Sequence, residues 1–491
     1  MIPLKLCILS SEIMPYAKTG GLADVAGALL GELGKLGHDV RAFMPLYAPV
    51  RRAHPELRPV PGLENIEASI GATRYAYSIK SAKSNGAGIV YFVDCPQMFD
   101  RAAFYTFDAD EHRRFLLFTR AAIDSCLRLG FMPQIFHCND WHTAFLPLYL
   151  KTIYSSQRRL AESRSLLTIH NIGYQGIMPA TAAADLGVAG YESWLDSADF
   201  AAGIINPLKN GIKLADVVTT VSPSYAREIC DTPLGMGMQE TLAARGNGVV
   251  GILNGVDYRE WDPRHDPHLT VHFGPGHWQG KLANKESLLR STGLAVEPRQ
   301  PLIGMVTRLA EQKGIDLLFD ALPALLKERD FGLVILGSGD ARYVAFFDEL
   351  SRRHPGRVAF RSGYDEAMAH LIEAGSDMFL MPSRYEPCGL NQMYSLRYGT
   401  VPIVRKTGGL ADSVQHFDPA TGTGTGCVFN DYDAPAVRWG VGTALDWYSE
   451  TEVWHRLMRN AMAQDFSWGR QAVKYEAIYR AVAASASSKS A

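Results

Sequence analysis

A seven-residue sequence that occurs twice, once in each half of the chain, is the feature that most constrains the fold. The residues Lys-Thr-Gly-Gly-Leu-Ala-Asp occupy positions 18–24 and again positions 406–412. Seven identical residues in the same order are hard to ascribe to chance, and the copies lie too far apart for a solenoid repeat. With 491 residues, the chain is also longer than one ordinary hydrophobic core supports. We therefore expect two similar domains, each with the same loop-to-helix turn.

Short apolar segments alternate with helical patterns over most of the chain. Apolar runs without polar alternation suit strands covered on both faces, and helices between such strands favour a parallel sheet. These segments are residues 4–9, 89–93, 135–137, 166–169, 217–221, 302–306, 333–336, 358–360, 378–381 and 401–404. The sequence thus predicts the α/β class, with a domain boundary near Asn254 and Gly255.

The composition excludes several classes of protein. Lys and Arg number 49 and Asp and Glu 51, a balance that supports neither a nucleic-acid partner nor a polybasic membrane surface. The seven cysteines are scattered and form no CxxC pair, so we expect no zinc site and no disulfide framework, and free thiols indicate a reducing compartment. We find no signal-peptide pattern and no apolar run that could span a bilayer. A cytoplasmic location is the resulting expectation.

The first copy of the repeat has the chemistry of an anion site. Gly20 and Gly21 stand directly before an amphipathic helical pattern over residues 22–36. Glycines let the backbone approach a ligand closely, and the free N–H groups of a helix start attract anions. Lys18 adds a positive charge beside them. A phosphate or diphosphate suits this loop, although a glycine turn with a solvated lysine gives the same pattern.

Two cations follow the expected strand at residues 302–306. Open α/β sheets bind ligands at the carboxyl ends of their strands, so Arg308 and Lys313 can converge there on a doubly charged leaving group. A surface loop with two solvated cations is the alternative.

Polar side chains follow three other expected strands. Glu386 comes after residues 378–381, and Pro387 biases it toward an extended backbone, from which it can face a sugar hydroxyl or a developing oxocarbenium cation. It could instead cap the next helix. His170 ends the strand at residues 166–169 and can be catalytic or structural. Asp140 with Trp141 suits a sugar, because an indole ring covers C–H groups, but Trp141 can equally be core.

Taken together, these segments resemble bacterial glycogen synthase and plant starch synthase, the glucan synthases that use a nucleotide-diphosphate glucose. The resemblance runs from about Lys5 to Tyr479, and the Arg…Lys pair and the Glu-bearing loop are shared more widely among retaining glycosyltransferases. The segments that carry it are residues 18–24, 140–142, 168–171, 254–257, 308 with 313, 386–390 and 407–412.

The resemblance implies two Rossmann-like domains of the GT-B type facing a deep interdomain cleft. Their expected limits are residues 1–254 and 255–465, followed by a helix over 466–482 that crosses back to the first domain and a frayed tail over 483–491. It implies transfer of glucose from ADP-glucose to the non-reducing end of glycogen or another α-1,4-glucan, with retention of configuration. It implies no cofactor and no metal, and it leaves the oligomeric state open.

The resemblance also implies roles for individual residues. Arg308 and Lys313 would carry the leaving ADP, Glu386 would stabilise positive charge by the glucose, and His170 would contact the transferring sugar. Further substrate contacts would lie near the donor diphosphate and sugar (Lys18, Gly20, Gly21), on the acceptor side (Asp140, Trp141), on the adenine (Tyr364) and beside the transferred glucose (Gly408, Gly409). The other expected substrate-binding residues are Asp24, Asn171, Asn254, Cys388, Gly389, Leu390 and Thr407. Asn391 departs from the family, which often has Thr there.

Two other readings of the sequence remain. One is a different retaining glycosyltransferase or a glucan phosphorylase, which would carry pyridoxal phosphate on a lysine. The other is a non-catalytic glycogen-binding or regulatory protein. The presence of Lys18, Arg308, Lys313 and Glu386 argues against a simple binder, which has no use for diphosphate cations.

Overall fold

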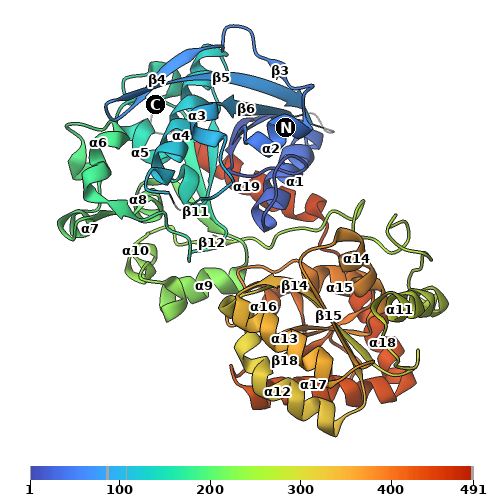
Figure 1. The fold of residues 1–491 in the computed structure, drawn as a ribbon. Coiled ribbons are helices and arrows are strands. Elements are labelled where there is room, and N and C mark those ends of the chain that lie inside the picture. Colours follow the sequence, from blue (N-terminus) through green and yellow to red (C-terminus); the bar gives the residue numbers. More distant parts are fainter. Residues whose placement is uncertain (1, 85–87, 107, 488–491) are drawn as a thin grey trace. The chain divides into compact units, whose positions relative to one another are not determined.

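The computed structural model describes residues 2–84, 88–106 and 108–487, which form two compact units (Figure 1). The chain passes from the first unit to the second after Ile252, next to the expected boundary, and returns to the first unit at Trp468. The first unit comprises Met1–Val221, Ala226–Ile252 and Trp468–Ala491, and the second comprises Ser222–Tyr225 and Leu253–Ser467.

The first unit is built on a sheet with the strand order β12-β11-β8-β7-β1-β2-β6-β5-β3, in which β4 pairs with β5. Neighbours from β12 to β6 are parallel, and Ile8 on the central β1 pairs with Ala42 on β2 and with His137 on β7. The strands are β1 (Lys5–Leu9), β2 (Asp39–Pro45), β3 (Arg58–Pro59), β4 (Ile66–Ile70), β5 (Thr73–Lys83), β6 (Ile89–Asp94), β7 (Ile135–Asn139), β8 (Arg164–Ile169), β11 (Val217–Thr220) and β12 (Val250–Gly251), with β9 (Met178–Pro179) and β10 (Ile204–Ile205) as a separate pair.

Helices connect these strands. The α-helices are α1 (Gly21–Lys35), α2 (Ala48–Ala53), α3 (Pro96–Phe99), α4 (Glu111–Arg128), α5 (Leu146–Lys151), α6 (Ala183–Leu186), α7 (Ser197–Ala201), α8 (Pro207–Leu214), α9 (Pro223–Asp231), α10 (Gln239–Ala243) and α19 (Trp468–Ser487). Short 3-10 turns are η1 (Trp141–Thr143), η2 (Arg158–Leu160), η3 (Ala180–Ala182), η4 (Glu192–Trp194) and η5 (Pro233–Gly235).

One edge of this sheet departs from the expected parallel arrangement. Strand β5 is antiparallel to β3, β4 and β6, and the β4–β5 turn closes directly from Ile70 to Thr73 around Gly71, whose φ is +59°. So short a connection permits only antiparallel pairing. Strand β5 has no continuous apolar run, which is why the sequence did not reveal it.

The C-terminal helix α19 belongs to the first unit and packs against α1, β7 and β8 (Figure 1, red among blue and green elements). A buried hydrogen bond of 2.8 Å joins the Tyr479 hydroxyl to His137 Nδ1. The apolar residues of this helix predict that it has a packing partner, and its contacts with α1, β7 and β8 provide one. The helix extends to Ser487, so residues 483–487 are helical rather than frayed, and residues 488–491 lie outside the described residues.

The second unit has a parallel sheet with the strand order β15-β14-β13-β16-β17-β18. Ile303, Leu333 and Met378 on three adjacent strands are fully buried in its core. Its elements are β13 (Leu302–Leu309), β14 (Gly332–Gly339), β15 (Val358–Ser362), β16 (Met378–Met381), β17 (Val401–Arg405), β18 (Cys427–Phe429), α11 (Trp278–Thr292), η6 (Glu311–Lys313), α12 (Ile315–Glu328), α13 (Ala341–Arg353), α14 (Glu366–Gly375), α15 (Asn391–Arg397), α16 (Gly408–Ser413), α17 (Ala434–Ser449) and α18 (Thr451–Met462).

All seven cysteines carry free thiols. None of the helices in the described part of the chain combines the length and hydropathy that crossing a membrane requires.

A buried carboxylate stabilises the helical region that precedes β11. Asp196 is only 8% exposed and accepts hydrogen bonds from Lys213 Nζ at 2.9 Å, from the Asp199 backbone N–H at 3.0 Å and from Lys209 Nζ at 3.1 Å. Burial raises the pKa of Asp196, but the three donors outweigh burial and hold its pKa well below the ordinary value.

We expect Asp196→Asn to lower the free energy of unfolding at pH 7 by about 1.5–3 kcal/mol, because two lysines lose a charged partner. Since the folded-state pKa is depressed, this contribution is present above about pH 4 and is lost as the pH falls further. Urea unfolding at pH 7 and in steps below pH 4 should show the difference between wild type and variant shrinking with acid. Asp39→Asn, at a more exposed ion pair with Arg41, is the control and should change stability by less than about 1 kcal/mol. Equal stability of Asp196→Asn and wild type at pH 7 would contradict this role.

Candidate active site

A buried carboxylate fixes the loop that precedes α1. Glu12 follows β1, is 2% exposed, and accepts hydrogen bonds from the backbone N–H and the hydroxyl of Thr19. The Tyr105 hydroxyl also donates to Glu12 Oε1 at 2.5 Å, and the Tyr105 ring lies 4.9 Å from the ring of His142. Glu12 therefore ties the first copy of the repeat to the end of β1 and, through Tyr105, to the turn after β7.

The first copy of the repeat leaves open space in front of a helix. Lys18 Nζ lies 2.9 Å from Asp24 Oδ1, in the first turn of α1, and Gly21 is the first residue of that helix. A Cβ atom on Gly20 would meet no atom of the described residues within 4 Å. The α1 start carries no side-chain cap, so its N–H groups can bind an anion beside the Lys18 charge.

The second copy is packed tightly instead. A Cβ atom on Gly408 would lie 1.9 Å from the Glu386 carbonyl oxygen, and one on Gly409 would lie 2.1 Å from the Cys388 carbonyl oxygen. The Gly409 N–H donates to the Glu386 carbonyl at 3.0 Å, and the buried Thr407 precedes α16. These glycines are required because two backbones touch, and this contact holds the loop that carries Glu386.

Asp140 and His170 meet where β7 and β8 end. Asp140 Oδ1 accepts the His170 backbone N–H at 2.7 Å, and Asp140 has φ +53° and ψ −173°, a backbone conformation that side-chain-bearing residues rarely adopt. Burial raises the pKa of Asp140 to about 7, against the lowering effect of the His170 and Asn171 backbone N–H groups. Asp140 thus holds the turn after β8, and its contact with acceptor hydroxyls stays a prediction.

The hydrogen bonds of His170 define its tautomer. The Asn139 side-chain amide donates to the Leu9 carbonyl at 2.9 Å, so its oxygen faces His170 Nε2, which donates to it at 2.8 Å. Nδ1 is then left as a hydrogen-bond acceptor. Burial lowers the pKa of His170 to about 3, so the ring is neutral at physiological pH and can accept a hydrogen bond from a hydroxyl.

Trp141 and Asn171 are only partly buried beside these residues. The Trp141 ring stacks on His142 with centroids 4.2 Å apart, and a Cβ atom on Gly176 would lie 2.2 Å from the indole. The Asn171 side-chain oxygen accepts the Gly173 N–H at 3.0 Å and closes a tight turn. Trp141 is therefore packed against protein on part of its surface, and its contact with a sugar stays a prediction.

The second unit brings a carboxylate and a cation together at adjacent strand ends. Lys313 Nζ donates to Glu386 Oε2 at 2.6 Å, and the Ser383 hydroxyl donates to the same oxygen at 3.1 Å. Glu386 is 4% exposed, so this pair is largely shielded from water. Arg308, near the end of β13, is exposed and contacts the Gln312 side-chain oxygen at 3.4 Å. Arg308 is close to Lys313 in the sequence, and its exposed guanidinium is available to a ligand.

Close contacts position the starts of α12 and α15 in this half. Gly314 has φ +69°, and a Cβ atom there would lie 2.0 Å from the Pro382 carbonyl oxygen. Gly389 has φ +72° and stands shortly before α15. The Asn391 side-chain amide donates to the Val306 carbonyl at 2.6 Å, which ties α15 to β13. Asn391 therefore has a structural contact of its own at the position where the family often has Thr.

The other expected residues of the second unit differ in their surroundings. Burial raises the pKa of the Cys388 thiol to about 12, so the thiol stays protonated, and Leu390 directly precedes α15. Asn254 is 4% exposed, and its Oδ1 has no hydrogen-bond partner among the described residues. Tyr364 is 65% exposed, and its hydroxyl donates to Glu366 at 2.5 Å. A tyrosine ring with this exposure can stack on an aromatic base.

Sequence reasoning missed several residues that hold these groups. Glu12, Tyr105 and Ser383 are hydrogen-bonded directly to the loops concerned. Glu12 had a readable signal, since it follows an apolar strand as Glu386 does. Ser383 had the same signal, because it also follows the strand at residues 378–381. Tyr105 had none, because its contact depends on how the loops fold.

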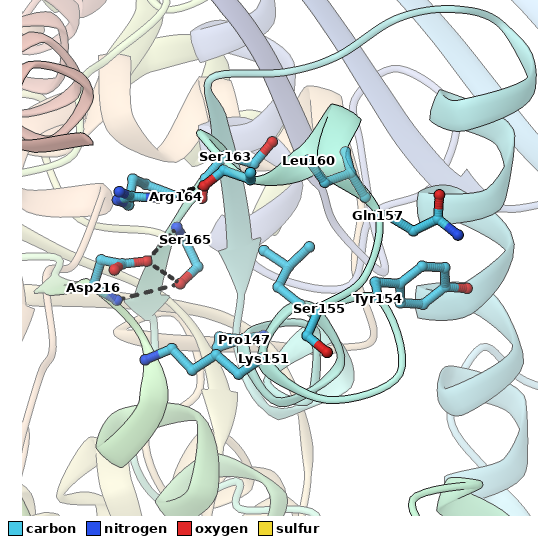
Figure 2. Close-up of a pocket in the computed structure, with 12 residues that line it drawn as sticks. Pro147, Lys151, Tyr154, Ser155, Gln157, Leu160, Ser163, Arg164, Ser165 and Asp216 are labelled. Carbon is cyan, nitrogen blue, oxygen red and sulfur yellow. Dashed lines mark hydrogen bonds between the residues drawn. The ribbon is translucent and has the colours of Figure 1, made fainter. Parts of the chain in front are cut away.

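A pocket of about 290 Å³ opens on another part of the first unit (Figure 2). Its lining includes Arg164 at the start of β8 and Asp216 directly before β11, which are amino ends of parallel strands. The Asp216 carboxylate accepts the N–H and the hydroxyl of Ser165, both at 2.8 Å. Figure 2 marks these contacts with dashed lines. None of the expected site residues lines this pocket, so it lies apart from the candidate active site.

Two doubly wound α/β units that carry cations, a carboxylate and an open helix start at strand carboxyl ends fit the class of glycosyltransferases. Comparison with known proteins agrees. Residues 5–244 match the starch synthase catalytic domain family, and residues 292–461 match the glycosyl transferases group 1 family.

Similar proteins cover the whole chain. A glycogen synthase from Anaeromyxobacter dehalogenans (strain 2CP-1 / ATCC BAA-258) is 44% identical over 98% of this chain and 99% of its own length, and one from Desulforudis audaxviator is 44% identical over 97% and 96%. The catalytic domain of Arabidopsis thaliana starch synthase IV, solved with ADP and acarbose, has a TM-score of 0.90 at 34% identity over 98% of this chain and 100% of its own. A sucrose-phosphate synthase from Thermosynechococcus elongatus, with a TM-score of 0.62 at 17% identity over 98% and 99%, shares the fold.

The chain belongs to the glycogen synthase family of glycosyltransferases. The α/β class with two Rossmann-like units and the family predicted from the sequence are thereby confirmed.

We expect Glu12→Gln to lower kcat/KM for glucosyl transfer by about 10- to 100-fold, because an amide cannot replace a carboxylate that accepts from Thr19 and Tyr105 at once. Steady-state kinetics with varied donor measures the loss. The control is Glu32→Gln on α1, where the carboxylate forms a surface pair with Lys35. A folded Glu12→Gln enzyme within twofold of wild type would show that the loop does not depend on this carboxylate.

Proposed function

We propose that the chain transfers glucose from ADP-glucose to the non-reducing end of an α-1,4-glucan with retention of configuration, releasing ADP. The observation that supports this most is the Lys313–Glu386 contact of 2.6 Å with Arg308 nearby in the chain. Cations suit the charge that develops on a departing diphosphate, and a carboxylate suits the positive charge on the sugar ring. The ADP in the solved Arabidopsis starch synthase IV structure and the names of the relatives support the choice of donor and polymer.

The two units contribute different groups to this proposal. In the second unit, Arg308 and Lys313 hold the diphosphate and the exposed Tyr364 stacks on the adenine. In the first unit, the α1 start with Lys18 is the proposed anion-binding element, and neutral His170 is the proposed acceptor of a hydrogen bond from a sugar hydroxyl. Asn254, whose buried oxygen lacks a partner among the described residues, is a further candidate for a substrate contact.

In the proposed step, the bond between glucose C1 and the diphosphate oxygen breaks first. The electron pair goes to the diphosphate, where Arg308 and Lys313 compensate the charge, and Glu386 stabilises the cationic ring. The acceptor hydroxyl then approaches from the same face, and its proton passes to the departing phosphate oxygen as the new C1–O bond forms. Configuration is retained because attack and departure share one face.

The proposal also includes a cytoplasmic, reducing compartment, with which the free thiols are consistent.

An incorporation assay tests the proposed function. Labelled ADP-glucose and UDP-glucose are each offered with glycogen, and label in the ethanol-precipitated polymer is counted with and without EDTA. We expect incorporation from ADP-glucose, greater than from UDP-glucose and unchanged by EDTA, because side-chain cations and helix starts supply the positive charge. Incorporation from neither donor would overturn the assignment.

Removing a cation should slow the reaction strongly. We expect Lys313→Ala and Arg308→Ala each to lower kcat by about 10²–10³-fold, as loss of a single oxyanion donor does. Lys313→Ala also leaves the buried Glu386 without its cation, so thermal unfolding must accompany the kinetics, whereas the exposed Arg308 can be removed without that penalty. Lys327→Ala on α12 is the matched control. Unchanged turnover in folded Arg308→Ala and Lys313→Ala would contradict the proposed step.

A further inference from the structure

Three side chains of the second unit form a cluster that the glucosyl-transfer proposal does not use. Glu366 and His370 lie one helical turn apart on α14, and Glu260 comes from the segment that follows Leu253. One carboxylate oxygen of each glutamate and a ring nitrogen of His370 all lie within 4.8 Å of one another. The two glutamates are partly exposed, and His370 is fully buried, so the cluster is open to solvent on one side.

His370 is held in place from two directions. Its Nδ1 lies 2.7 Å from the Asp266 carboxylate, and Asp266 also accepts from the Tyr398 hydroxyl. The Trp261 ring stacks on the imidazole with centroids 3.7 Å apart and an interplanar angle of 15°. A histidine whose Nδ1 is bound to a carboxylate presents Nε2 in a fixed direction, as metal-ligating histidines commonly do.

The Nε2 atom of His370 is left without a hydrogen bond. It is buried and has no hydrogen-bond partner among the described residues, and the nearest carboxylate oxygen, Oε1 of Glu366, is 3.6 Å away. That distance is too long for a hydrogen bond. It matches the separation of about 3.4 Å between two ligand atoms that are each about 2.1 Å from one tetrahedral cation.

We propose that Glu260, Glu366 and His370 bind a divalent transition-metal cation, for which Zn²⁺ is the fitting probe. One imidazole nitrogen with two carboxylate oxygens favours Zn²⁺ over Mg²⁺, which prefers an all-oxygen octahedron. Water fills the remaining coordination positions on the exposed side. The cation links the segment around Glu260 to α14, so its role is structural, and glucosyl transfer does not require it.

The cation and Tyr364 would share the Glu366 carboxylate. The Tyr364 hydroxyl donates to Glu366 Oε2, whereas the oxygen that faces His370 is Oε1 of the same carboxylate. One carboxylate can therefore hold the cation and keep the tyrosine contact at once. Glu260→Gln removes a ligand without touching this contact, which makes it the preferred variant, and Glu366→Gln is the second.

The test uses the full chain after EDTA treatment and removal of the chelator. Zn²⁺ binding is measured by calorimetry, and the unfolding temperature is measured with and without Zn²⁺. Co²⁺ serves as a spectroscopic probe, because binding to nitrogen and oxygen donors lacks the near-ultraviolet charge-transfer band of a cobalt–thiolate bond and so excludes the partly exposed Cys230. Glu349→Gln on α13, a surface carboxylate paired with Arg352 and Arg353, is the matched control.

We expect one equivalent of Zn²⁺ to bind and to raise the unfolding temperature by about 3 °C when free Zn²⁺ exceeds the Kd about 100-fold. Glu260→Gln and Glu366→Gln should each weaken binding by about 100-fold, and Glu349→Gln should bind as wild type does. Absence of a stoichiometric site, a thiolate band with Co²⁺, or wild-type affinity in either folded variant would overturn the proposal. Because binding is read without any glucosyl donor, failure of this site and failure of the proposed function are distinguishable.

Discussion

The candidate site of the second unit is organised around one ion pair, in which Lys313 and the buried Glu386 meet at 2.6 Å. The sheet makes this pair possible, since β13 and β16 are adjacent and parallel and their carboxyl ends release the two loops side by side. Glu386 is 4% exposed, so an unpaired carboxylate there would destabilise the folded state. The ion pair is therefore favourable only if both side chains are fixed in position. Ser383 and the backbone of the second repeat copy supply that hold.

The two copies of the repeated sequence have different surroundings in the two units. In the first copy, Gly20 borders open space and Asp24 pairs with Lys18, which leaves a helix start exposed for an anion. In the second copy, Gly408 touches the Glu386 backbone, and Asp412 accepts from the Ser224 N–H and hydroxyl. Identical residues thus border open space in one unit and pack against another backbone segment in the other, because the neighbouring loop differs.

Much of this arrangement could be predicted from the sequence, because buried parallel strands are continuous apolar runs and the chemistry follows their ends. The sequence indicated three candidate site residues in this way, namely Arg308, Lys313 and Glu386. Strand β5 was not, since only one of its faces is buried and its apolar residues are interspersed with polar ones. The hydrogen bonds between Glu12 and Thr19 and between Asp140 and His170 could not be predicted either. Hydrogen bonds between loops depend on conformations that no sequence periodicity encodes.

The central claim is that Arg308 and Lys313 carry the diphosphate of the donor while Glu386 attends the sugar. A crystal structure of the full chain with ADP and a glucose-containing ligand tests it most directly. We predict diphosphate oxygens at hydrogen-bond distance, about 3 Å, from both the Arg308 guanidinium and Lys313 Nζ, with the hexose against the Glu386 carboxylate. A well-ordered diphosphate that touches neither cation would contradict the account.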